Sequence, residues 1–410
     1  MAKAVQYAAI DVGTTKVCTL VGQINASGGV EVVGVGVVPS RGLQKGMVVN
    51  IDEATDAIRA SIQRATHSSG GQIRHAYLGI TGSHLTSVNN RGTVTMVRPD
   101  RLVAGDDVSR VMEAARTTVG VPNNREVIHV LPRGYTLDGQ EGIRNPIGLH
   151  GFRLDVDAHI IMGALTSIQN LTKCVEQLGV TVDDLVLEPL ASGEAVLTDD
   201  ERENGTLLVD IGGGTTDIAV FQQGSVAHTS IIPIGGHQFT QDLVIGLRAP
   251  YAAAEAAKIA HGTVEPDGVG GDEMVELSAF GETAKRPVSR RLMADILRAR
   301  FDELVELVQA EVRKAGYLGL LPAGAVLTGG SSGLGHLTEV AEHLFNMPAR
   351  IGRPSGVSGL TDSISAPAFA TSVGLLLWAA RFGDLEAPGQ SGFSLTEWIQ
   401  NLLALLRGRN

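Results

Sequence analysis

The chain contains one pattern twice, and this duplication limits its possible folds more than any other feature. The two segments are YAAIDVGTTKVCTLVGQ, which begins at Tyr7, and TLLVDIGGGTTDIAVFQQG, which begins at Thr206. Each contains an apolar strand with an Asp near its end, a turn rich in Gly and Thr, and a second apolar strand. Two such β-hairpins in one chain indicate a duplicated domain. The repeat therefore predicts two similar lobes.

Further strands and helices follow both hairpins. EVVGVGVVPS comes after the first hairpin and SVAHTSIIPIGG after the second, and helical sequence follows each of them. In DEATDAIRASIQRAT the apolar residues recur at the spacing of a helix that lies on a sheet. They are Ala54, Ile58, Ile62 and Ala65. Strands and helices in this order predict an α/β fold.

Two stretches fall outside the repeat and are predicted to be insertions. The first, 85–157, combines the helical DDVSRVMEAARTT with short alternating strands such as REVIHVLPRGYTL, which predicts a small α+β subdomain in the first lobe. The second, 240–323, carries the helical runs DLVIGLRAPYAAAEAAKIAHG and RRLMADILRARFDELVELVQAEVRKAG. The predicted core of the first lobe is then 1–84, 158–191 and 369–382, and that of the second is 192–239 and 324–368.

Composition places the chain among folded globular proteins and argues against nucleic acid as a partner. Hydrophobic residues make up 43% of the 410 residues, charged residues 19%, and the net charge of −11 opposes phosphate binding. Cys18 and Cys174 lie far apart and outside any metal-ligand spacing, which predicts reduced thiols and a cytosolic protein without structural zinc. No secretory leader and no run of about 18 apolar residues is recognisable, so no signal peptide or spanning helix is expected.

The end of the sequence predicts a detached amphipathic helix. The polar, Pro- and Gly-containing GDLEAPGQSG, 383–392, is typical of a flexible linker. In 393–410, about 15 helical residues would reach only about 22 Å, short of a bilayer core of about 30 Å, so the helix should lie in the membrane interface. A helix docked on its own protein is the alternative. The side chains predicted to contact lipid are Phe393, Leu395, Trp398, Ile399, Leu402, Leu403 and Leu406.

The two Gly turns have the composition of phosphate-binding loops. Gly lets backbone N–H groups approach a phosphate closely, and Thr hydroxyls can donate further hydrogen bonds. Carboxylates beside such turns repel a bare phosphate, so they predict a cation, best satisfied by Mg²⁺ held through its waters. The carboxylates are Asp11, Asp210 and Asp217. The sequence therefore predicts a metal nucleotide between the lobes, with ordinary hairpin turns as the alternative.

A third Gly-rich stretch, AVLTGGSSGLGHL from Ala325, also has the pattern of a dehydrogenase cofactor turn. Only about 80 residues follow it, too few for the doubly wound sheet of such enzymes. The Tyr-x-x-x-Lys pair of short-chain dehydrogenases is missing, and the sequence has no P-loop, HExxH or GxSxG motif. These absences disfavour a dehydrogenase and the common hydrolases.

Taken in order, IDVGTTK, VDIGGGTTDIAV and VLTGGSSG resemble the phosphate-1, phosphate-2 and adenosine motifs of the superfamily of actin, sugar kinases and heat-shock chaperones. LEPLASGEA and TSVGLLLWAA are similar to its two connecting helices. The resemblance implies a two-lobed actin-like ATPase fold, built from duplicated ribonuclease-H-like domains that close on Mg-ATP. The nucleotide-binding positions that it implies are Gly13, Thr14, Thr15, Lys16, Gly212, Gly213, Gly214, Thr215, Thr216, Gly235, Gly236, Glu255, Lys258, Gly329, Gly330 and Ser331.

The same resemblance gives Glu188 a tentative catalytic role. Glu188 stands where chaperone relatives place a residue that orients the attacking water, and a carboxylate there could act as a weak base. The alternative is an acidic residue favoured by the dipole at a helix start, just before Pro189. We therefore expect at most a slow Mg-dependent ATPase.

Within this superfamily the chain resembles the FtsA family, bacterial actin-like proteins that tie FtsZ filaments to the inner membrane. The resemblance rests on PSRGLQKGMVVNID, YLGITGSHL, EGIRNPIGLHGFRLDVDAHII, RPVSRRLMADILRARFDELVELV, RIGRPSGVSGLTD and the terminal segment. It implies an ATP-binding protein that polymerises and lies on the cytoplasmic face of the cell membrane at the division septum. It also implies that 85–157 contacts other subunits and recruits later division proteins. By the same resemblance, 240–323 accepts the C-terminal tail of FtsZ, with Arg300 on that surface or as a solvated helix charge.

Three other members of the superfamily remain as alternatives. A small-molecule kinase would need a catalytic Asp beyond the predicted metal set, and a pilus-assembly adaptor would not be expected to carry the terminal helix. A chaperone would need a substrate-binding domain of about 200 residues after the ATPase core. The sequence favours the filament-forming membrane adaptor over all three.

Overall fold

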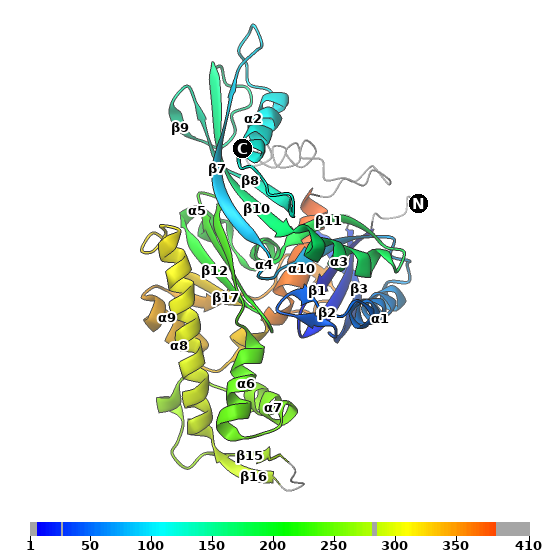
Figure 1. Ribbon diagram of the computed structural model, residues 1–410, viewed down its shortest axis with the longest axis vertical. Coiled ribbons are helices and arrows are strands. Elements are labelled where there is room, and N and C mark those ends of the chain that lie inside the picture. Colours follow the sequence, from blue (N-terminus) through cyan, green and yellow to red (C-terminus); the bar gives the residue numbers. More distant parts are fainter. Residues whose placement is uncertain (1–5, 26–27, 281–284, 383–410) are drawn as a thin grey trace.

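The computed structural model describes residues 6–25, 28–280 and 285–382, and it shows two lobes, each built around its own sheet (Figure 1). The first-lobe sheet has the order β11-β6-β1-β2-β3-β19, and the second-lobe sheet has the order β14-β13-β12-β17-β18. The predicted α/β class and duplication are confirmed.

In the first lobe, a hairpin of antiparallel strands stands beside parallel neighbours. The strands are β1 (Gln6–Val12), β2 (Lys16–Ile24), β3 (Val30–Pro39), β6 (His75–Ile80), β11 (Thr181–Leu187) and β19 (Val357–Gly359). The helix predicted to lie on this sheet is α1 (Ile51–Ser69), which buries Ala54, Ile58 and Ala65 against it and leaves Ile62 half-buried. Gly36 of β3 lets α1 approach, because a Cβ there would overlap the Ser61 carbonyl oxygen.

The second lobe repeats the hairpin and its third strand. Its strands are β12 (Thr206–Ile211), β13 (Thr216–Gln222), β14 (Ser225–Ile232), β17 (Ala325–Thr328) and β18 (Ala349–Ile351). The two hairpins have matching registers, but Asp11 lies opposite Cys18 whereas Asp210 lies opposite Asp217. The second turn therefore carries one more carboxylate than the first.

The first insertion forms a separate four-stranded sheet at the top of Figure 1, covered by α2 (Gly105–Thr118). Its strands are β7 (Thr86–Thr95), β8 (Arg125–Leu137), β9 (Gln140–Ile143) and β10 (Arg153–Ala164). The segment REVIHVLPRGYTL is one long strand rather than short ones, and β10 continues in this sheet past 157, the boundary predicted from the sequence.

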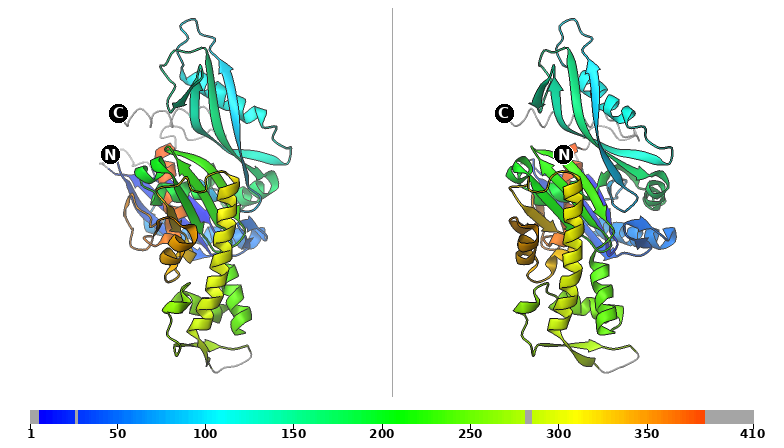
Figure 2. Two further views of the ribbon diagram at one scale, coloured as in Figure 1. Left: turned by 90° about the vertical axis from the view of Figure 1, so that its left-hand side faces the viewer. Right: turned by 60° about the vertical axis from the view of Figure 1, so that its left-hand side comes forward.

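The second insertion lies at the opposite end of the molecule (Figures 1 and 2). It contains α6 (Gly236–Leu247), α7 (Tyr251–His261), β15 (Met274–Ser278), β16 (Lys285–Ser289) and α8 (Arg290–Lys314), which extends back along the second-lobe sheet. The single helical run expected over 242–262 is wrong: Arg248 has a left-handed φ of 46°, and Pro250 cannot donate the hydrogen bond that would continue the helix.

Two helices cross between the lobes, as the superfamily resemblance implied. They are α4 (Glu188–Val196) and α10 (Ala370–Phe382). Gly374 permits the crossing, since a Cβ there would overlap the carbonyl oxygen of Ala191. The remaining elements are α3 (Leu165–Glu176), α5 (Asp199–Asn204), α9 (Leu337–Phe345), β4 (Leu43–Gln44), β5 (Met47–Val48), η1 (Pro266–Gly268), η2 (Gly330–Gly333) and η3 (Pro367–Phe369).

Sheet membership departs from the predicted division in one further place. Val357–Gly359 pairs with β3 in the first-lobe sheet, although 324–368 was assigned to the second lobe. The predicted linker, 383–392, and amphipathic helix, 393–410, lie outside the described residues. None of the helices within the described ranges is long and apolar enough to cross a membrane.

Candidate functional site

The two predicted phosphate turns face each other across the lobes. The same backbone hydrogen bond closes each turn: Gly13 N–H donates to the Lys16 carbonyl at 3.1 Å, and Gly212 N–H donates to the Thr215 carbonyl at 2.9 Å. Gly213 and Gly214 lie against the first turn, because a Cβ on either would overlap the hydroxyl of Thr15 or of Thr14. Glycine is therefore what allows the turns to approach.

The start of α6 completes this group of loops. Gly236 N–H donates to the Gly212 carbonyl at 2.9 Å, and His237 N–H donates to the Gly213 carbonyl at 2.8 Å. His237 was missed from the sequence, yet its ring Nε2 lies 3.5 Å from the Thr15 hydroxyl in the other lobe. Its position directly after the Gly235–Gly236 pair is the signal that could have identified it.

The residues predicted on the adenosine side lie against the second turn. Ser331 Oγ donates to the Gly212 carbonyl at 3.2 Å, and Gly329 has φ +84° and leaves no room for a Cβ beside Asp210. Lys258 Nζ donates to the Gly236 carbonyl at 2.9 Å and forms an ion pair with Glu255 at 2.8 Å. The predicted set is thus assembled in one place, although its contacts with a nucleotide stay predictions.

Two predicted phosphate ligands are engaged elsewhere in this structure. Thr216 Oγ1 donates to the Ile234 carbonyl at 2.8 Å. Lys16 Nζ donates to the Ala368 carbonyl and lies 4.8 Å from the centre of the Phe369 ring. The single hydroxyl proton of Thr216 must leave the Ile234 carbonyl before it can reach a phosphate, whereas the Lys16 ammonium has two further N–H groups that can donate.

Four carboxylates are buried between the turns and the crossing helices. Asp11, Asp210, Asp217 and Glu188 are each at most 8% exposed. Ser372 Oγ donates to Asp11 at 2.6 Å, and Asp210 accepts from Ser192 and, at 3.1 Å, from Thr371. Asp217 accepts from Thr81 of the first lobe and, at 3.2 Å, from Thr215.

Burial and mutual repulsion disfavour the charged forms of these carboxylates. Burial is the largest cause that raises the pKa of Asp210, Asp217 and Glu188, and for Glu188 the charges of Asp11, Asp217 and Asp210 raise it further. Hydroxyl hydrogen bonds to Asp210 and Asp217 oppose the rise, as Lys16 does for Glu188. A cation in this cluster would relieve the repulsion.

The donor set fits a hydrated cation rather than one enclosed by protein ligands. Among the described residues, no group of three or more Asp, Glu, His or Cys side chains could hold a metal ion directly. Mg²⁺ commonly keeps several waters and uses one or two carboxylates together with substrate phosphates. The predicted role of Asp11, Asp210 and Asp217, through water, is compatible with this arrangement and stays a prediction.

Arg300 lies on α8 and has two acidic neighbours. Its guanidinium donates to both oxygens of Asp242 on α6, at 2.6 and 2.9 Å, and also to Glu303. These hydrogen bonds raise the pKa of Arg300. The side chain therefore joins α6 to α8, which neither the binding role nor the solvated role predicted.

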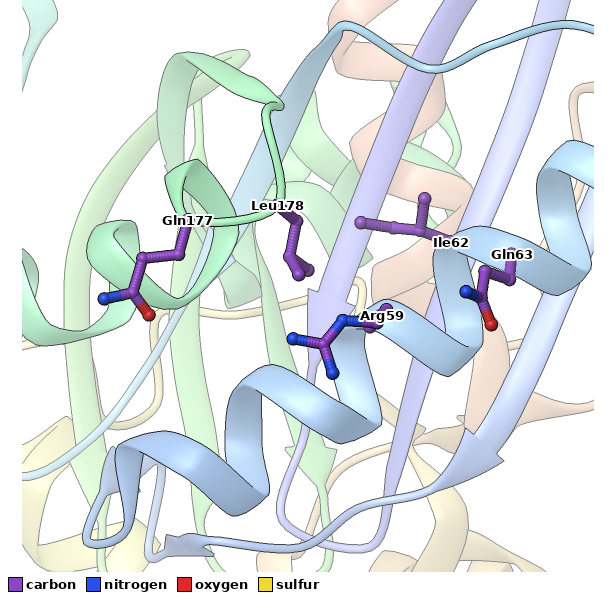
Figure 3. Close-up of a pocket in the computed structure, with 5 residues that line it drawn as sticks. All are labelled: Arg59, Ile62, Gln63, Gln177 and Leu178. Carbon is purple, nitrogen blue, oxygen red and sulfur yellow. The ribbon is translucent and has the colours of Figure 1, made fainter.

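A shallow pocket of about 380 Å³ lies between α1 and the end of α3, on the first lobe (Figure 3). Arg59, Ile62 and Gln63 line it from α1, with Gln177 and Leu178 opposite. None of these residues belongs to the predicted nucleotide, metal or partner sites.

Solved structures define the class of protein. A type IV pilus biogenesis complex of PilM and PilN matches with a TM-score of 0.66 at 15% identity, covering 92% of this chain and 99% of that chain. MreB5 of Spiroplasma citri bound to ADP matches with a TM-score of 0.54 at 13% identity, covering 91% and 95%. At these identities the likeness shows the fold alone, and that fold is the two-lobed actin-like ATPase fold.

Sequence comparison then gives the family. The family model "Cell division protein FtsA" matches residues 207–374, and "SHS2 domain inserted in FTSA" matches 82–162. The "Cell division protein FtsA" of Pseudomonas aeruginosa is 45% identical over 90% of this chain and 88% of its own length. That of Escherichia coli K12 is 37% identical over 97% and 96%. The chain belongs to the FtsA family of cell division proteins, and its first insertion is the SHS2 domain of that family.

Proposed function

We propose that this protein is an ATP-binding, filament-forming adaptor that tethers FtsZ filaments to the cytoplasmic face of the cell membrane at the division septum. The observation that carries the proposal is the meeting of two Gly-Thr turns beside buried carboxylates, in a member of the FtsA family. Backbone N–H groups in such turns suit phosphate oxygens, and the carboxylates suit the cation that accompanies them.

Different residues of the chain are proposed to bind the phosphates, the adenosine and the Mg²⁺ of Mg-ATP. The turns at Gly13 and Gly212 flank the phosphates from opposite lobes, and Gly329 to Ser331 with Lys258 line the adenosine side. Mg²⁺ would supply positive charge between the phosphates and the carboxylates, and Asp11 and Asp210 would hold its waters. Asp217, the third carboxylate of the predicted set, already accepts a hydrogen bond at each oxygen. Glu188, whose pKa is raised by burial and by the neighbouring carboxylates, is proposed to orient the attacking water, and any hydrolysis is expected to be slow.

Titration of a fluorescent ATP analogue tests the nucleotide site. The purified protein should bind the analogue more tightly in Mg²⁺ than in EDTA, and unlabelled ATP should displace it. Equal weak binding in both buffers would contradict the proposal. The variant Asp272→Asn, which changes an exposed loop carboxylate of the second insertion, serves as the control.

We propose further that 393–410 binds anionic lipid as an interfacial helix, because its apolar residues recur at helical spacing. One helix should bind reversibly, and many along a filament should bind firmly. Co-sedimentation with anionic vesicles should fall sharply when 393–410 is removed. Unchanged sedimentation would overturn the lipid role and favour docking on the protein itself.

The FtsZ tail is assigned to the second insertion, which exposes several large apolar side chains. They are Ile245, Tyr251, Ile259, Met274 and Leu292. Because Arg300 joins α6 to α8, Arg300→Glu should weaken co-pelleting with an FtsZ tail peptide, while Arg291→Glu, at a more exposed ion pair on the same helix, should not. Full binding by Arg300→Glu would remove this residue from the site.

Self-assembly and recruitment of later division proteins complete the proposal. The first insertion projects from the body of the molecule, a position that suits contacts with other chains (Figure 2). Incubation with Mg-ATP on anionic lipid should give filaments or sheets by electron microscopy. Their absence across nucleotide and lipid conditions would contradict the polymer.

A further inference from the structure

Three hydroxyl groups on the crossing helices contact the two carboxylates that end equivalent strands. Ser372 of α10 donates to Oδ2 of Asp11 at 2.6 Å. Ser192 of α4 and Thr371 of α10 both donate to Oδ2 of Asp210, and the two hydroxyl oxygens lie 2.9 Å apart. Neighbouring residues of one helix thus reach carboxylates of different lobes.

In each of these two carboxylates, only one oxygen accepts hydrogen bonds from the helix hydroxyl groups. Among the described residues, no side-chain hydrogen bond reaches Oδ1 of Asp11 or Oδ1 of Asp210. Oδ1 of Asp11 faces the first phosphate turn, 3.8 Å from the position of a Cβ on Gly13, and Oδ1 of Asp210 faces Gly329. The hydroxyl groups therefore direct one oxygen of each carboxylate toward the cleft.

Asp217, in the same cluster, has a hydrogen-bond donor at each of its two carboxylate oxygens. Its Oδ1 accepts from Thr81 and its Oδ2 accepts from Thr215. Oδ1 of Asp11 and Oδ1 of Asp210 differ from these atoms, because in the described part of the chain they have no side-chain partner and yet are not among the buried atoms left without one, so both reach solvent in the cleft. The two free oxygens fit groups that bind the waters of a cation.

The hydroxyl groups are themselves fixed in place. Ser192 and Ser372 are at most 1% exposed and Thr371 is 8% exposed, at the point where α4 and α10 pack most closely through Gly374. A side chain held this tightly cannot rotate away from its partner without repacking the crossing. The distance between the two carboxylates therefore depends on how the helices cross.

We propose that Ser192, Thr371 and Ser372 are positioning residues for Mg²⁺: they orient Asp210 and Asp11 so that the free oxygens hold the hydrated cation beside the nucleotide phosphates. This assignment rests on the proposed Mg-ATP site and extends it to residues outside the phosphate and adenosine motifs. Outer partners of metal ligands commonly change metal affinity by about 10–100-fold when they are removed.

Thr371 offers a matched pair of variants. Thr371→Val keeps the shape and removes the hydroxyl, whereas Thr371→Ser keeps the hydroxyl. Titration of a fluorescent ATP analogue in Mg²⁺ and in EDTA gives the gain in affinity that the metal provides. Thr371→Val and Ser372→Ala should each reduce this gain about 10-fold or more, with affinity in EDTA unchanged. Thr371→Ser should retain it, and so should Ser109→Ala in the first insertion, which also loses a hydroxyl hydrogen bond.

A second readout does not depend on nucleotide fluorescence. Mn²⁺ bound in place of Mg²⁺ gives an electron paramagnetic resonance spectrum that reports its coordination, and Thr371→Val should broaden or weaken the bound signal while Thr371→Ser restores it. A full metal-dependent gain and an unchanged Mn²⁺ spectrum in Thr371→Val and Ser372→Ala would overturn the assignment and leave the nucleotide site standing. A wild-type protein without any metal-dependent gain would overturn both.

Discussion

The cleft and the junction between the first insertion and the second lobe both bury titratable side chains, and their pKa values are shifted in opposite directions. In the cleft, burial raises the pKa of Asp210, Asp217 and Glu188. At the junction, burial lowers the pKa of His159 to about 3 and also lowers that of His228. Each region resists the charged form of its own groups.

Hydrogen bonding separates the two regions. Both ring nitrogens of His159 are paired: Nδ1 lies 2.6 Å from the Asn89 amide oxygen, and Nε2 lies 2.8 Å from the Thr229 hydroxyl. Neutral His159 thus needs no further partner. In the cleft, Asp11 and Asp210 keep free oxygens among like charges. The contrast teaches that a buried polar side chain indicates a ligand when it keeps an atom without a protein partner among like charges, and a structural contact when, like His159, both of its polar atoms are paired.

The largest effect should come from removing one cleft charge. Asp210→Asn keeps the shape of the side chain but loses the charge that attracts a cation, so the Mg-dependent gain in nucleotide affinity should fall by more than about 100-fold, beyond the loss typical of an outer partner. The nucleotide-free variant should also melt at a higher temperature, because a buried repulsive charge is gone. Calorimetry of nucleotide binding and of thermal unfolding measures both. If Asp210→Asn kept the full gain in nucleotide affinity from Mg²⁺, the cleft carboxylates would not act as cation ligands, and the cleft would no longer differ from the junction in function.

The second largest effect should come from acid, which is expected to change the stability contributed by the junction and by the cleft in opposite directions. His159, and also His129 of the first insertion, whose Nε2 accepts from the Leu187 N–H, have folded pKa values of about 3. The unfolded value is about 6.5, so the unfolded chain binds more protons between these values. Their contribution to stability is full above about pH 6.5 and is lost as pH falls, at about 2 kcal/mol per histidine by pH 5. His159→Gln should reduce this loss in melting curves between pH 7 and pH 5. An identical acid loss in the variant would contradict the buried neutral state.

The cleft carboxylates should change stability with pH in the opposite direction. Their folded pKa values are raised, so the folded chain binds more protons and stability falls as pH rises from about 4 through the folded pKa. Asp217→Asn should flatten this decline in the nucleotide-free protein, and Mg-ATP should flatten it in the wild type. Melting curves in the same pH series measure both changes. If stability declined with rising pH equally in the wild type, in Asp217→Asn and in the presence of Mg-ATP, the groups responsible would lie outside the cleft.

The sequence predicted what local motifs encode. The Gly turns, Asp11, Asp210 and the two connecting helices follow from short patterns, and all of them meet in the fold. The hydrogen bonds of Asp210 to Ser192 and Thr371 could not be read in the same way, since they join residues far apart in the chain. The Ala-rich run across Pro250 appeared helical because its composition outweighed one breaking residue.

At the junction, the same limit applies to individual side chains. Nothing around His159 in the sequence indicates that it meets Thr229 across the lobes. Arg300 likewise was predicted as a contact for the FtsZ tail or as a solvated helix charge, and the residue that it pairs with, Asp242, lies 58 positions away in the chain. Partners that are distant in sequence decide whether a polar residue is structural or available to a ligand.

A smaller effect, measured near neutral pH, tests whether the His159 contacts at the junction are structural. His159→Gln leaves Thr229 or Asn89 without a good partner, so the free energy of unfolding at pH 7.5 should fall by about 1–3 kcal/mol. Nucleotide affinity in Mg²⁺ should stay unchanged, because the junction is not part of the cleft. Denaturant unfolding and nucleotide titration measure the two quantities. A loss of metal-dependent affinity without a loss of stability would mean that the junction acts on the cleft.

The smallest effect should come from a charged joint that is complete but less buried. The side chains of Arg300 and Asp242 are 22% and 25% exposed, so solvent screens their attraction more than it screens the cleft charges. Arg300→Lys keeps the charge but cannot reproduce the two-pronged contact, and should cost about 1 kcal/mol of unfolding free energy. Because the pair is complete, like His159 with its partners, Mg-dependent nucleotide affinity should not change. A change in that affinity from this distant joint would show that complete polar clusters also transmit the state of the cleft, which would break the rule drawn from the comparison.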